Sequence, residues 1–428
     1  MRIVFTSVLK PVSDPRLLAR LGRALAELPG AEVHIVAHAA ADAPTARPDT
    51  ERPNVWLHPI FRFPRLSLAR ALAGRTLTAK LAELRPDILV IGTAELLPAG
   101  LRWHRATGKP LVYDVRENYA LNIRTQGVFP PLVAPLLAAR IERLEKKAAP
   151  YLAGALLAER VYAEQLPWLR HCAQVEIIEN KYQTVNTIFT TLSSQINPFH
   201  RPLRLLLSGT LSELYGTFAV IDEVAEMRTA GCLPVELWIV GYAPRTADAH
   251  RLHHLAAATP WLRLTAIDRH VPHTEIIAAI RQADVGLLAY LPHPSLDGCI
   301  PTKLWEYLGE RLPTLRRLPS GKWLMVDPAS LHLAFSSGNA LAPIPASQTN
   351  SSNPTPQTSD STYGQSRVAR VMFTEASAFD LSHGTSLPDA LTKMLHSVGA
   401  ERPPAPPEAF WATEAPRLLA FFRAILLA

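Results

Sequence analysis

Short apolar runs alternate with longer amphipathic stretches through the first half of the chain. Runs of strand length, rich in branched and aromatic side chains, are Ile3–Val8, Glu32–His38, Val55–Phe61, Asp87–Gly92, Leu111–Val115, Ala155–Ala158 and Val175–Ile178. Apolar residues at helical spacing lie between them, at Pro15–Leu28, Leu66–Leu84, Glu95–Thr107, Leu132–Lys147 and Arg160–Leu169. This alternation predicts a parallel sheet with helices on both faces, in which ligands bind at the carboxyl ends of the strands.

The same alternation begins again in the second half. Strands are expected at Leu203–Leu207, Val235–Val240, Leu262–Ile267, Val285–Tyr290, Thr314–Leu315 and near Ala378–Leu381, and the last of these precedes a helix at Leu387–His396. We therefore predict an α/β protein with two doubly wound, Rossmann-like domains, at 1–185 and 202–408. A polar linker is expected at 186–201, a flexible insertion rich in Ser, Thr, Asn and Pro at 336–366, and an amphipathic terminal helix at 409–428.

The composition excludes several classes of protein. With 428 residues, 48% of them hydrophobic and 19% charged, the chain is long enough for two globular domains. Its net charge of +7 favours anionic partners, such as nucleotide diphosphates or an acidic membrane surface. Nucleic acid is not expected, because the Lys and Arg residues are dispersed and no zinc-finger or RNA-binding motif is present. Three scattered cysteines, with no signal-peptide core and no membrane-spanning run, predict a cytoplasmic protein.

The segment Leu296–Arg317 predicts a turn, a short helix and a strand. Asp297-Gly298 favours a turn, and Pro301 sets the backbone for a helix whose N-cap is Thr302. Gly309 is suited to end that helix in the left-handed conformation. The amino end of the helix is therefore expected at the carboxyl edge of the second sheet, where ligands bind.

Lys303 and Glu306 are three residues apart, so they share one face of the first turn of this helix. A carboxylate accepts two hydrogen bonds from a vicinal diol, and an ammonium group beside free backbone N–H groups holds phosphate. A nucleotide-sugar carries both a diol and a diphosphate, so a site with a carboxylate and an ammonium group is suited to bind one. The alternative reading of the same residues is a capped helix with an ordinary i,i+3 ion pair.

Pro301-Thr302-Lys303-Leu304-Trp305-Glu306-Tyr307-Leu308 resembles the Pro-x-Lys-φ-φ-Glu-Tyr box of GT-B fold glycosyltransferases, group 1 (family 4-like). The resemblance implies two facing Rossmann-like domains and a terminal helix that crosses back onto the first. It also implies sugar transfer from a nucleotide-diphosphate donor with retention of configuration. In this family the box's glutamate, here Glu306, holds the ribose, which makes Pro301, Thr302 and Lys303 candidate donor-binding residues.

Glycines follow two strands of the second half, where phosphate approaches the backbone in such folds. Gly209 and Thr210 end the first of these strands, and Gly241 ends the second. In the resembled family, Gly-Arg-Leu and Lys-Gly provide two cations there; this chain has Thr210 and Tyr215 at the cationic positions. Lys303, together with the Gly209 loop, is therefore expected to hold the diphosphate. The glycine-rich fingerprint of dinucleotide-dependent enzymes is absent, which argues against a dehydrogenase.

Many family members carry a second glutamate eight residues before the ribose-binding one. Gly298 occupies that position in this chain, and Asp297 beside it is the candidate substitute. No Asp-x-Asp motif of metal-dependent glycosyltransferases is present, so we expect neither a metal nor another cofactor. Basic groups and helix dipoles are sufficient in principle to stabilise a leaving diphosphate.

Polar residues are concentrated in Tyr113-Asp114-Val115-Arg116-Glu117-Asn118-Tyr119, where the fifth strand of the first half ends. This stretch resembles the family's Asp-x-His-Glu box, with Arg116 in place of the histidine that contacts the transferred sugar. Asp114, Arg116 and Glu117 are therefore candidate catalytic residues, and Glu117 is expected near the acceptor. The alternative is a polar loop with an Asp cap.

The stretch Leu132–Lys147 predicts an amphipathic helix with a basic face, on which Arg140, Arg143, Lys146 and Lys147 lie. Such a helix either covers a sheet or lies on an anionic membrane, as a peripheral protein at the inner face of the plasma membrane. The expected function is a glycosyltransferase that acts on a glycan or lipid-linked acceptor in surface polysaccharide or glycolipid biosynthesis. Two alternatives remain: a non-catalytic scaffold of the same fold and a nucleotide-sugar epimerase.

Overall fold

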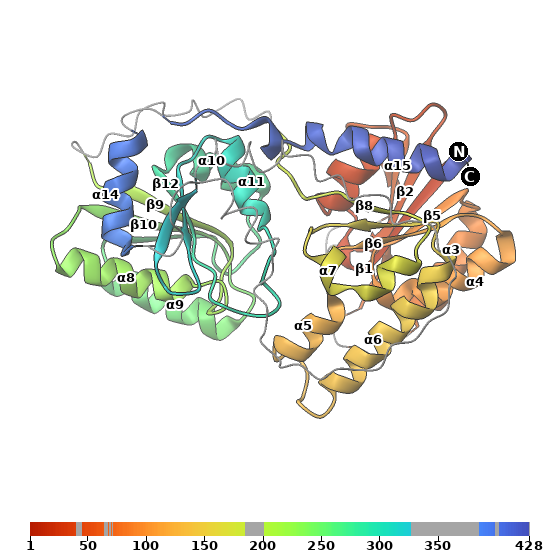
Figure 1. Ribbon diagram of the computed structural model, residues 1–428, viewed down its shortest axis with the longest axis horizontal. Helices are drawn as coiled ribbons and strands as arrows, with labels where there is room; N and C mark the ends of the chain where they lie inside the picture. The colour runs from red at the N-terminus through yellow and green to blue at the C-terminus, as the bar shows by residue number, and fades with distance from the viewer. Residues whose placement is uncertain are drawn as a thin grey trace, which may run out of the picture.

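The computed structural model describes residues 1–39, 45–63, 67, 70, 72–184, 201–326, 385–398 and 402–427. The insertion expected at 336–366 and the strand expected near Ala378–Leu381 lie outside the described residues, as does the linker predicted at 186–201 apart from its last residue. The described chain forms two sheets, each with helices packed around it (Figure 1).

The first half of the chain builds an eight-stranded sheet in the order β3-β4-β2-β1-β5-β6-β7-β8. All neighbouring strands pair in parallel except β3, which is antiparallel to β4 and was not expected. Every strand that the sequence predicts in this half is present. The strands are β1 (Arg2–Pro11), β2 (Glu32–His38), β3 (Arg47–Pro48), β4 (Val55–Phe61), β5 (Ile88–Ile91), β6 (Leu111–Val115), β7 (Gly154–Leu157) and β8 (Val175–Ile177).

Helices on both faces of this sheet bury the central strands. The expected helix Pro15–Leu28 is instead a π-helix followed by one α-helical turn, and the expected helix Arg160–Leu169 is divided in two. Pro167 explains the division, because helical geometry is disfavoured for the residue before a proline. The helices are η1 (Arg16–Gly22), α1 (Arg23–Leu25), α3 (Ala73–Leu84), η2 (Ala94–Leu96), α4 (Leu97–Thr107), α5 (Tyr119–Thr125), α6 (Ala134–Ala148), η3 (Ala149–Tyr151), α7 (Tyr162–Gln165) and η4 (Pro167–His171).

The second half builds a six-stranded sheet in the order β11-β10-β9-β12-β13-β14. Its strands are parallel except β14, which is antiparallel to β13. The two sheets confirm the predicted α/β class with two doubly wound units. The strands are β9 (Leu203–Thr210), β10 (Val235–Tyr242), β11 (Leu262–Thr265), β12 (Val285–Leu288), β13 (Thr314–Arg317) and β14 (Trp323–Val326), and the helices are α8 (Thr217–Thr229), α9 (Thr246–Ala258), α10 (His273–Gln282), α11 (Thr302–Gly309) and α14 (Leu387–Val398).

Two chain segments that connect the halves lie side by side. Tyr182 and Phe410 form a parallel bridge, in which Tyr182 N–H donates to the Ala409 carbonyl and Trp411 N–H donates to the Tyr182 carbonyl. After η6 (Pro407–Ala409) and η7 (Trp411–Thr413), α15 (Ala415–Leu427) runs along the first sheet (Figure 1). Its fully buried Phe422 belongs to the same core as the first strand. The helix α15 therefore packs against the first half.

The ends of α11 differ from those that the sequence predicts. Pro301 is the N-cap residue, Thr302 is the first helical residue, and no side chain caps the amino end. Gly309 is helical, and the left-handed residue is Arg311 with φ 60°. Gly309 serves packing instead, because a methyl group on it would lie 2.2 Å from the Tyr182 ring. Tyr182 thereby joins this helix to the connection between the halves.

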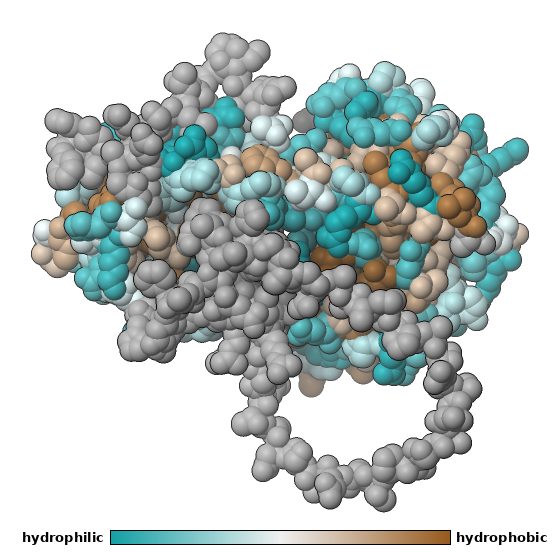
Figure 2. Space-filling view, turned by 45° about the horizontal axis from the view of Figure 1, so that its top comes forward, coloured by the Kyte–Doolittle hydropathy of each residue, from teal (hydrophilic) through white to brown (hydrophobic). Residues whose placement is uncertain are grey.

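The surface of the described chain has few large apolar side chains. No helix in the part of the chain that the structure describes is long and apolar enough to cross a membrane. On the face shown in Figure 2, hydrophilic residues predominate and hydrophobic ones occur in small groups. The most exposed of the large apolar residues include Leu132 and Leu136, beside the amino end of α6.

Candidate functional site

A cleft of about 2530 Å³ lies between the two halves of the molecule. The carboxyl ends of strands from both sheets contribute to its walls, as expected for doubly wound sheets. Glu117 and Glu159 line it from the first half, and Gly209, Lys303 and Glu306 line it from the second. Side chains that the sequence singled out in both halves are thus brought to one site.

The amino end of α11 opens onto this cleft. Leu304, Trp305 and Leu308 are almost fully buried and fix the helix against the second sheet. Lys303 and Glu306 lie on the opposite face of the first turn and line the cleft, as do Pro301 and Thr302. Because no side chain caps this end, its backbone N–H groups are suited to bind an anion.

Glu306 is only 9% exposed and has a histidine partner that sequence reasoning did not identify. Its Oε1 lies 2.9 Å from Nε2 of His273, the first residue of α10. A buried arginine of the first half, Arg20, is also near: burial lowers the pKa of Arg20 to about 10, and the charge of Glu306 opposes that shift. The carboxylate of Glu306 therefore lies near polar side chains from both halves.

Lys303 extends from α11 toward the Gly209 loop. A methyl group on Gly209 would lie 3.7 Å from Lys303 Nζ, and this ammonium lies 5.1 Å from the centroid of the Tyr290 ring. Burial lowers the pKa of Lys303 to about 8, although the charge of Glu306 opposes the shift. Desolvation disfavours the charged form of the Lys303 amine, and a bound diphosphate would favour it again. The amine is therefore well suited to bind an anion.

Close backbone approach explains the glycines at the ends of β9 and β10. Gly209 and Gly241 are paired neighbours, and a methyl group on Gly241 would lie 1.9 Å from the Gly209 carbonyl oxygen. Gly209 itself has a φ of 93°, which favours glycine. The preceding Ser208 hydroxyl lies 2.9 Å from the Tyr307 hydroxyl of α11, which fixes the loop against the helix.

The resembled family has two basic residues beside the Gly209 loop, and this chain has Thr210 and Tyr215 at those positions. Thr210 is exposed at the cleft, and Tyr215 packs edge to face against Tyr290, with the ring centroids 5.3 Å apart. A different cation, Arg316 on β13, lines the cleft. Burial lowers the pKa of Arg316 to about 10, and the nearby charge of Asp297 opposes this. Asp297 is exposed in the turn before α11 and also lines the cleft.

Of the three candidate catalytic residues in the first half, Glu117 lines the cleft and is accessible. Its Oε2 accepts a hydrogen bond of 3.0 Å from Asn122, and its Oε1 lies 3.6 Å from the Lys10 ammonium. The side chain is 38% exposed. A hydroxyl group entering the cleft from this side is therefore able to reach the Glu117 carboxylate.

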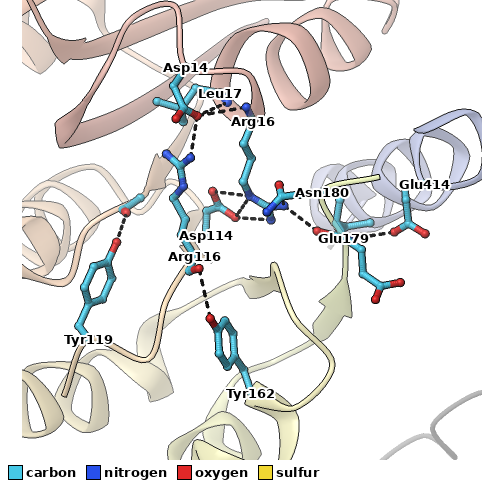
Figure 3. A network of polar contacts seen from close by, with 12 residues as sticks. Asp14, Arg16, Leu17, Asp114, Arg116, Tyr119, Tyr162, Glu179, Asn180 and Glu414 are labelled. Atoms are coloured by element: carbon cyan, nitrogen blue, oxygen red, sulfur yellow. Dashed lines mark hydrogen bonds and ion pairs between the residues drawn. The ribbon is translucent and has the colours of Figure 1, made fainter. Parts of the chain in front are cut away.

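Asp114 and Arg116 are absent from the described residues that line the cleft, and they belong to a buried network beneath it (Figure 3). Asp114 is fully buried and accepts hydrogen bonds from the Arg16 guanidinium, at 2.6 Å from Nη2 and 3.0 Å from Nε. Arg116 donates to Asp14 Oδ1 over 2.6 Å, so its side chain points toward the loop after β1. Both side chains therefore form buried ion pairs that hold loops in place.

The same network reaches the connection between the halves. Arg16 also donates to the carbonyl oxygen of Ile178 at 2.6 Å and to Asn180 Oδ1 at 3.0 Å, and Arg20 donates to the carbonyl oxygen of Lys181 at 2.7 Å. The π-helical turn of η1 therefore directs both arginines to one chain segment, which agrees with the frequent occurrence of π-turns at special sites.

Several polar residues of the site were not predicted from the sequence. They are His273 on α10, Arg316 on β13 and Glu159 after β7, and no motif marks any of them in the sequence. The signal that was available is positional: Glu159 follows β7, as Glu117 follows β6, at the ligand-binding edge of the sheet. Among the described residues, no group of three or more His, Cys, Asp or Glu side chains is arranged to hold a metal ion.

Solved structures of the same architecture were found by structural comparison. Sucrose-phosphate synthase from Thermosynechococcus elongatus superposes with a TM-score of 0.60 at 12% identity, over 100% of this chain and 99% of the other. The α,α-trehalose 6-phosphate synthase from Burkholderia multivorans superposes with a TM-score of 0.52 at 12% identity, over 99% and 98%. The chain has the GT-B fold of these glycosyltransferases.

A further similar structure is described as trehalose-6-phosphate from E. coli bound with UDP-2-fluoro glucose. It has a TM-score of 0.52 and 12% identity, and the match covers 98% of each chain. No family model matches the sequence. No curated protein sequence matches it either.

Proposed function

We propose that the protein is a glycosyltransferase that moves a sugar from a nucleotide-diphosphate donor to an acceptor hydroxyl, with retention of configuration. The observation that carries this proposal is the first turn of α11. It presents Glu306 and Lys303 in an interdomain cleft, where Lys303 faces the Gly209 loop. A carboxylate for a diol and an ammonium for a diphosphate match the two polar parts of such a donor.

The donor half of the cleft supplies the groups that such a transfer needs. Glu306 binds the ribose diol, while Lys303, Arg316 and the N–H groups of α11 hold the diphosphate. As the bond between sugar and diphosphate breaks, negative charge grows on the leaving oxygen, and these groups stabilise it. No side chain has to form a covalent intermediate if the acceptor attacks from the side of the leaving group.

The first half receives the acceptor and positions the loops around it. Glu117 is the group near the acceptor hydroxyl, since it follows β6 at the ligand-binding edge of the sheet, lines that wall and is 38% exposed. Asp114 and Arg116 act as positioning residues, because each holds a loop through a buried ion pair. Arg116 therefore does not take over the sugar contact made by histidine in the resembled family.

The test is a thermal-shift screen against nucleoside diphosphates and nucleotide-sugars, followed by assays of transfer with the best donor. We expect one donor class to raise the melting temperature and to lose its sugar only when an acceptor is added. Conversion of the sugar nucleotide without any acceptor would instead indicate an epimerase. Absence of binding across the whole panel would leave the non-catalytic scaffold as the better explanation.

We further propose that the acceptor belongs to a glycan or glycolipid at an anionic membrane surface, which the α5–α6 hairpin contacts. Leu132 is 88% exposed and Leu136 is 72% exposed, so apolar side chains project from this hairpin. The hairpin extends away from both sheets (Figure 1). The buried stripe of α6 consists of Ala134, Ala138, Glu145 and Ala148, while Arg140, Arg143, Lys146 and Lys147 are exposed.

We expect the protein to float with anionic vesicles at low salt and to remain in solution at high salt. Each basic residue near an anionic surface contributes about 1 kcal/mol, and salt screens this attraction. A variant with the four basic residues of α6 changed to Gln should lose flotation. A matched control changes four exposed cations of the second half, Arg251, Arg263, Arg269 and Lys393, and should float like the native protein. Native protein that stays in solution at low salt would favour a soluble acceptor.

A further inference from the structure

A carboxyl group of the first half forms a direct bond to the second half beside the proposed donor site. Glu159 follows β7 at the carboxyl edge of the first sheet, is partly buried and lines the cleft. Its Oε2 accepts a hydrogen bond of 2.9 Å from the backbone N–H of Ile300. Ile300 lies two residues before the first helical residue of α11. Glu159 thus contacts the chain that leads into the helix carrying Lys303 and Glu306.

The first half also holds this leading segment at a second place. His293 Nε2 lies 3.0 Å from the Thr125 carbonyl oxygen, and Gln126 donates to the Ser295 hydroxyl over 3.3 Å. The segment 293–300 is therefore fixed by α5 at one end and by Glu159 at the other. The position of the amino end of α11 relative to the first half depends on both contacts.

Few groups near Glu159 favour its charged form. Burial raises the pKa of Glu159 to about 8, and the charge of Glu179 adds to the increase, while the bond from Ile300 and the charge of Arg16 oppose it. The other titratable groups that interact with it are the phenols of Tyr162 and Tyr290 and the thiol of Cys299. At neutral pH the side chain is therefore mainly a neutral acid, and it ionises in mildly alkaline solution.

We propose that Glu159 is a donor-binding residue that admits the anionic donor only while it is protonated. This inference rests on the proposed donor site. As a neutral acid, Glu159 accepts the Ile300 N–H with one oxygen and retains an O–H donor for a phosphate oxygen. As a carboxylate, it binds the same N–H more strongly and repels the diphosphate. The charge of one side chain in the first half thereby controls anion binding at a helix of the second.

The expected pH dependence follows from mass action. If the complex requires the protonated form, affinity falls as pH rises above the pKa of about 8, by a factor that reaches about tenfold at pH 9. The Lys303 amine, with a pKa of about 8, loses its charge over the same range and adds a further loss. Glu159→Gln removes the titration of Glu159 and leaves that of Lys303. The ratio of the affinity of the variant to the affinity of the native protein therefore isolates the contribution of Glu159.

The experiment measures the affinity for inorganic diphosphate and for UDP by calorimetry between pH 6.5 and pH 9. We expect Glu159→Gln and the native protein to bind alike at pH 7, and the variant to bind about tenfold more tightly at pH 9. Glu159→Asp keeps a titrating carboxyl and should follow the native curve. Glu164→Gln, an exposed change of equal charge on α7, serves as the control and should also follow it.

Parallel curves for native protein and Glu159→Gln would overturn the role of Glu159 and leave the donor site standing. If neither ligand binds to the folded native protein at any pH, the donor site fails and this inference fails with it. If Glu159→Gln does not fold, the comparison moves to Glu159→Asp. In that variant the affinity should fall at alkaline pH by more than the loss of the Lys303 charge alone predicts. A smaller fall would contradict the proposal.

Discussion

Replacement of Glu306 by alanine is expected to weaken nucleoside diphosphate binding by about 1.5–3 kcal/mol, roughly ten- to hundredfold, and to abolish transfer. The physical reason is the loss of a charged hydrogen-bond acceptor for the ribose diol. The affinity for inorganic diphosphate should change little, because that ligand has no ribose. Comparing the two ligands by calorimetry therefore separates a ribose contact from a general effect on the cleft.

The control for this experiment is Glu275→Gln. Glu275 lies on α10 near His273, but it is exposed and pairs with Arg269 over 3.5 Å at the surface. We expect it to bind both ligands like the native protein. Equal losses for nucleoside diphosphate and inorganic diphosphate in Glu306→Ala would mean that Glu306 orders the helix rather than binds the ribose. Undiminished affinity for both would remove Glu306 from the site.

The strands and the donor-side segments were predictable because each depends on neighbours in sequence. Alternating apolar runs identify strands buried on both faces, and the turn at Gly298, where φ is 73°, follows from local backbone preference. The shared face of Lys303 and Glu306 follows from helical geometry alone. These local rules were sufficient to predict the fold class and one wall of the candidate site.

Residues whose roles depend on distant partners were not predictable in the same way. Asp114 appeared to be a candidate for chemistry because polar residues at strand ends are often functional, but its partner Arg16 lies 98 positions away in sequence. Glu159 meets Ile300 across 141 positions, and Gly309 makes room for Tyr182 rather than ending a helix. Only the fold brings such pairs together, and no local pattern indicates which residues will meet.

Substitution of Asp114 by asparagine is expected to destabilise the folded protein by about 3–5 kcal/mol. The side chains of Asp114 and Arg16 are 0% and 2% exposed, so the change leaves a buried guanidinium without its counter-charge. Arg16 also donates a hydrogen bond to the carbonyl oxygen of Ile178, so the loss of stability should extend to the connection between the halves. Thermal unfolding should show a melting temperature lower by about 6–20 °C for a unit of this size.

Glu27→Gln is the matched control, because Glu27 forms an ion pair with Arg52 in which both side chains are about half exposed. Exposed pairs contribute roughly 0–1 kcal/mol, so this variant should unfold close to the native temperature. A second measurement decides the role of Asp114 itself. If Asp114→Asn unfolds like the native protein and binds nucleoside diphosphate normally, yet fails to transfer sugar, the carboxylate takes part in the chemistry. A large drop in melting temperature with donor affinity retained below that temperature would instead identify Asp114 as the buried counter-charge that holds Arg16 beneath the cleft.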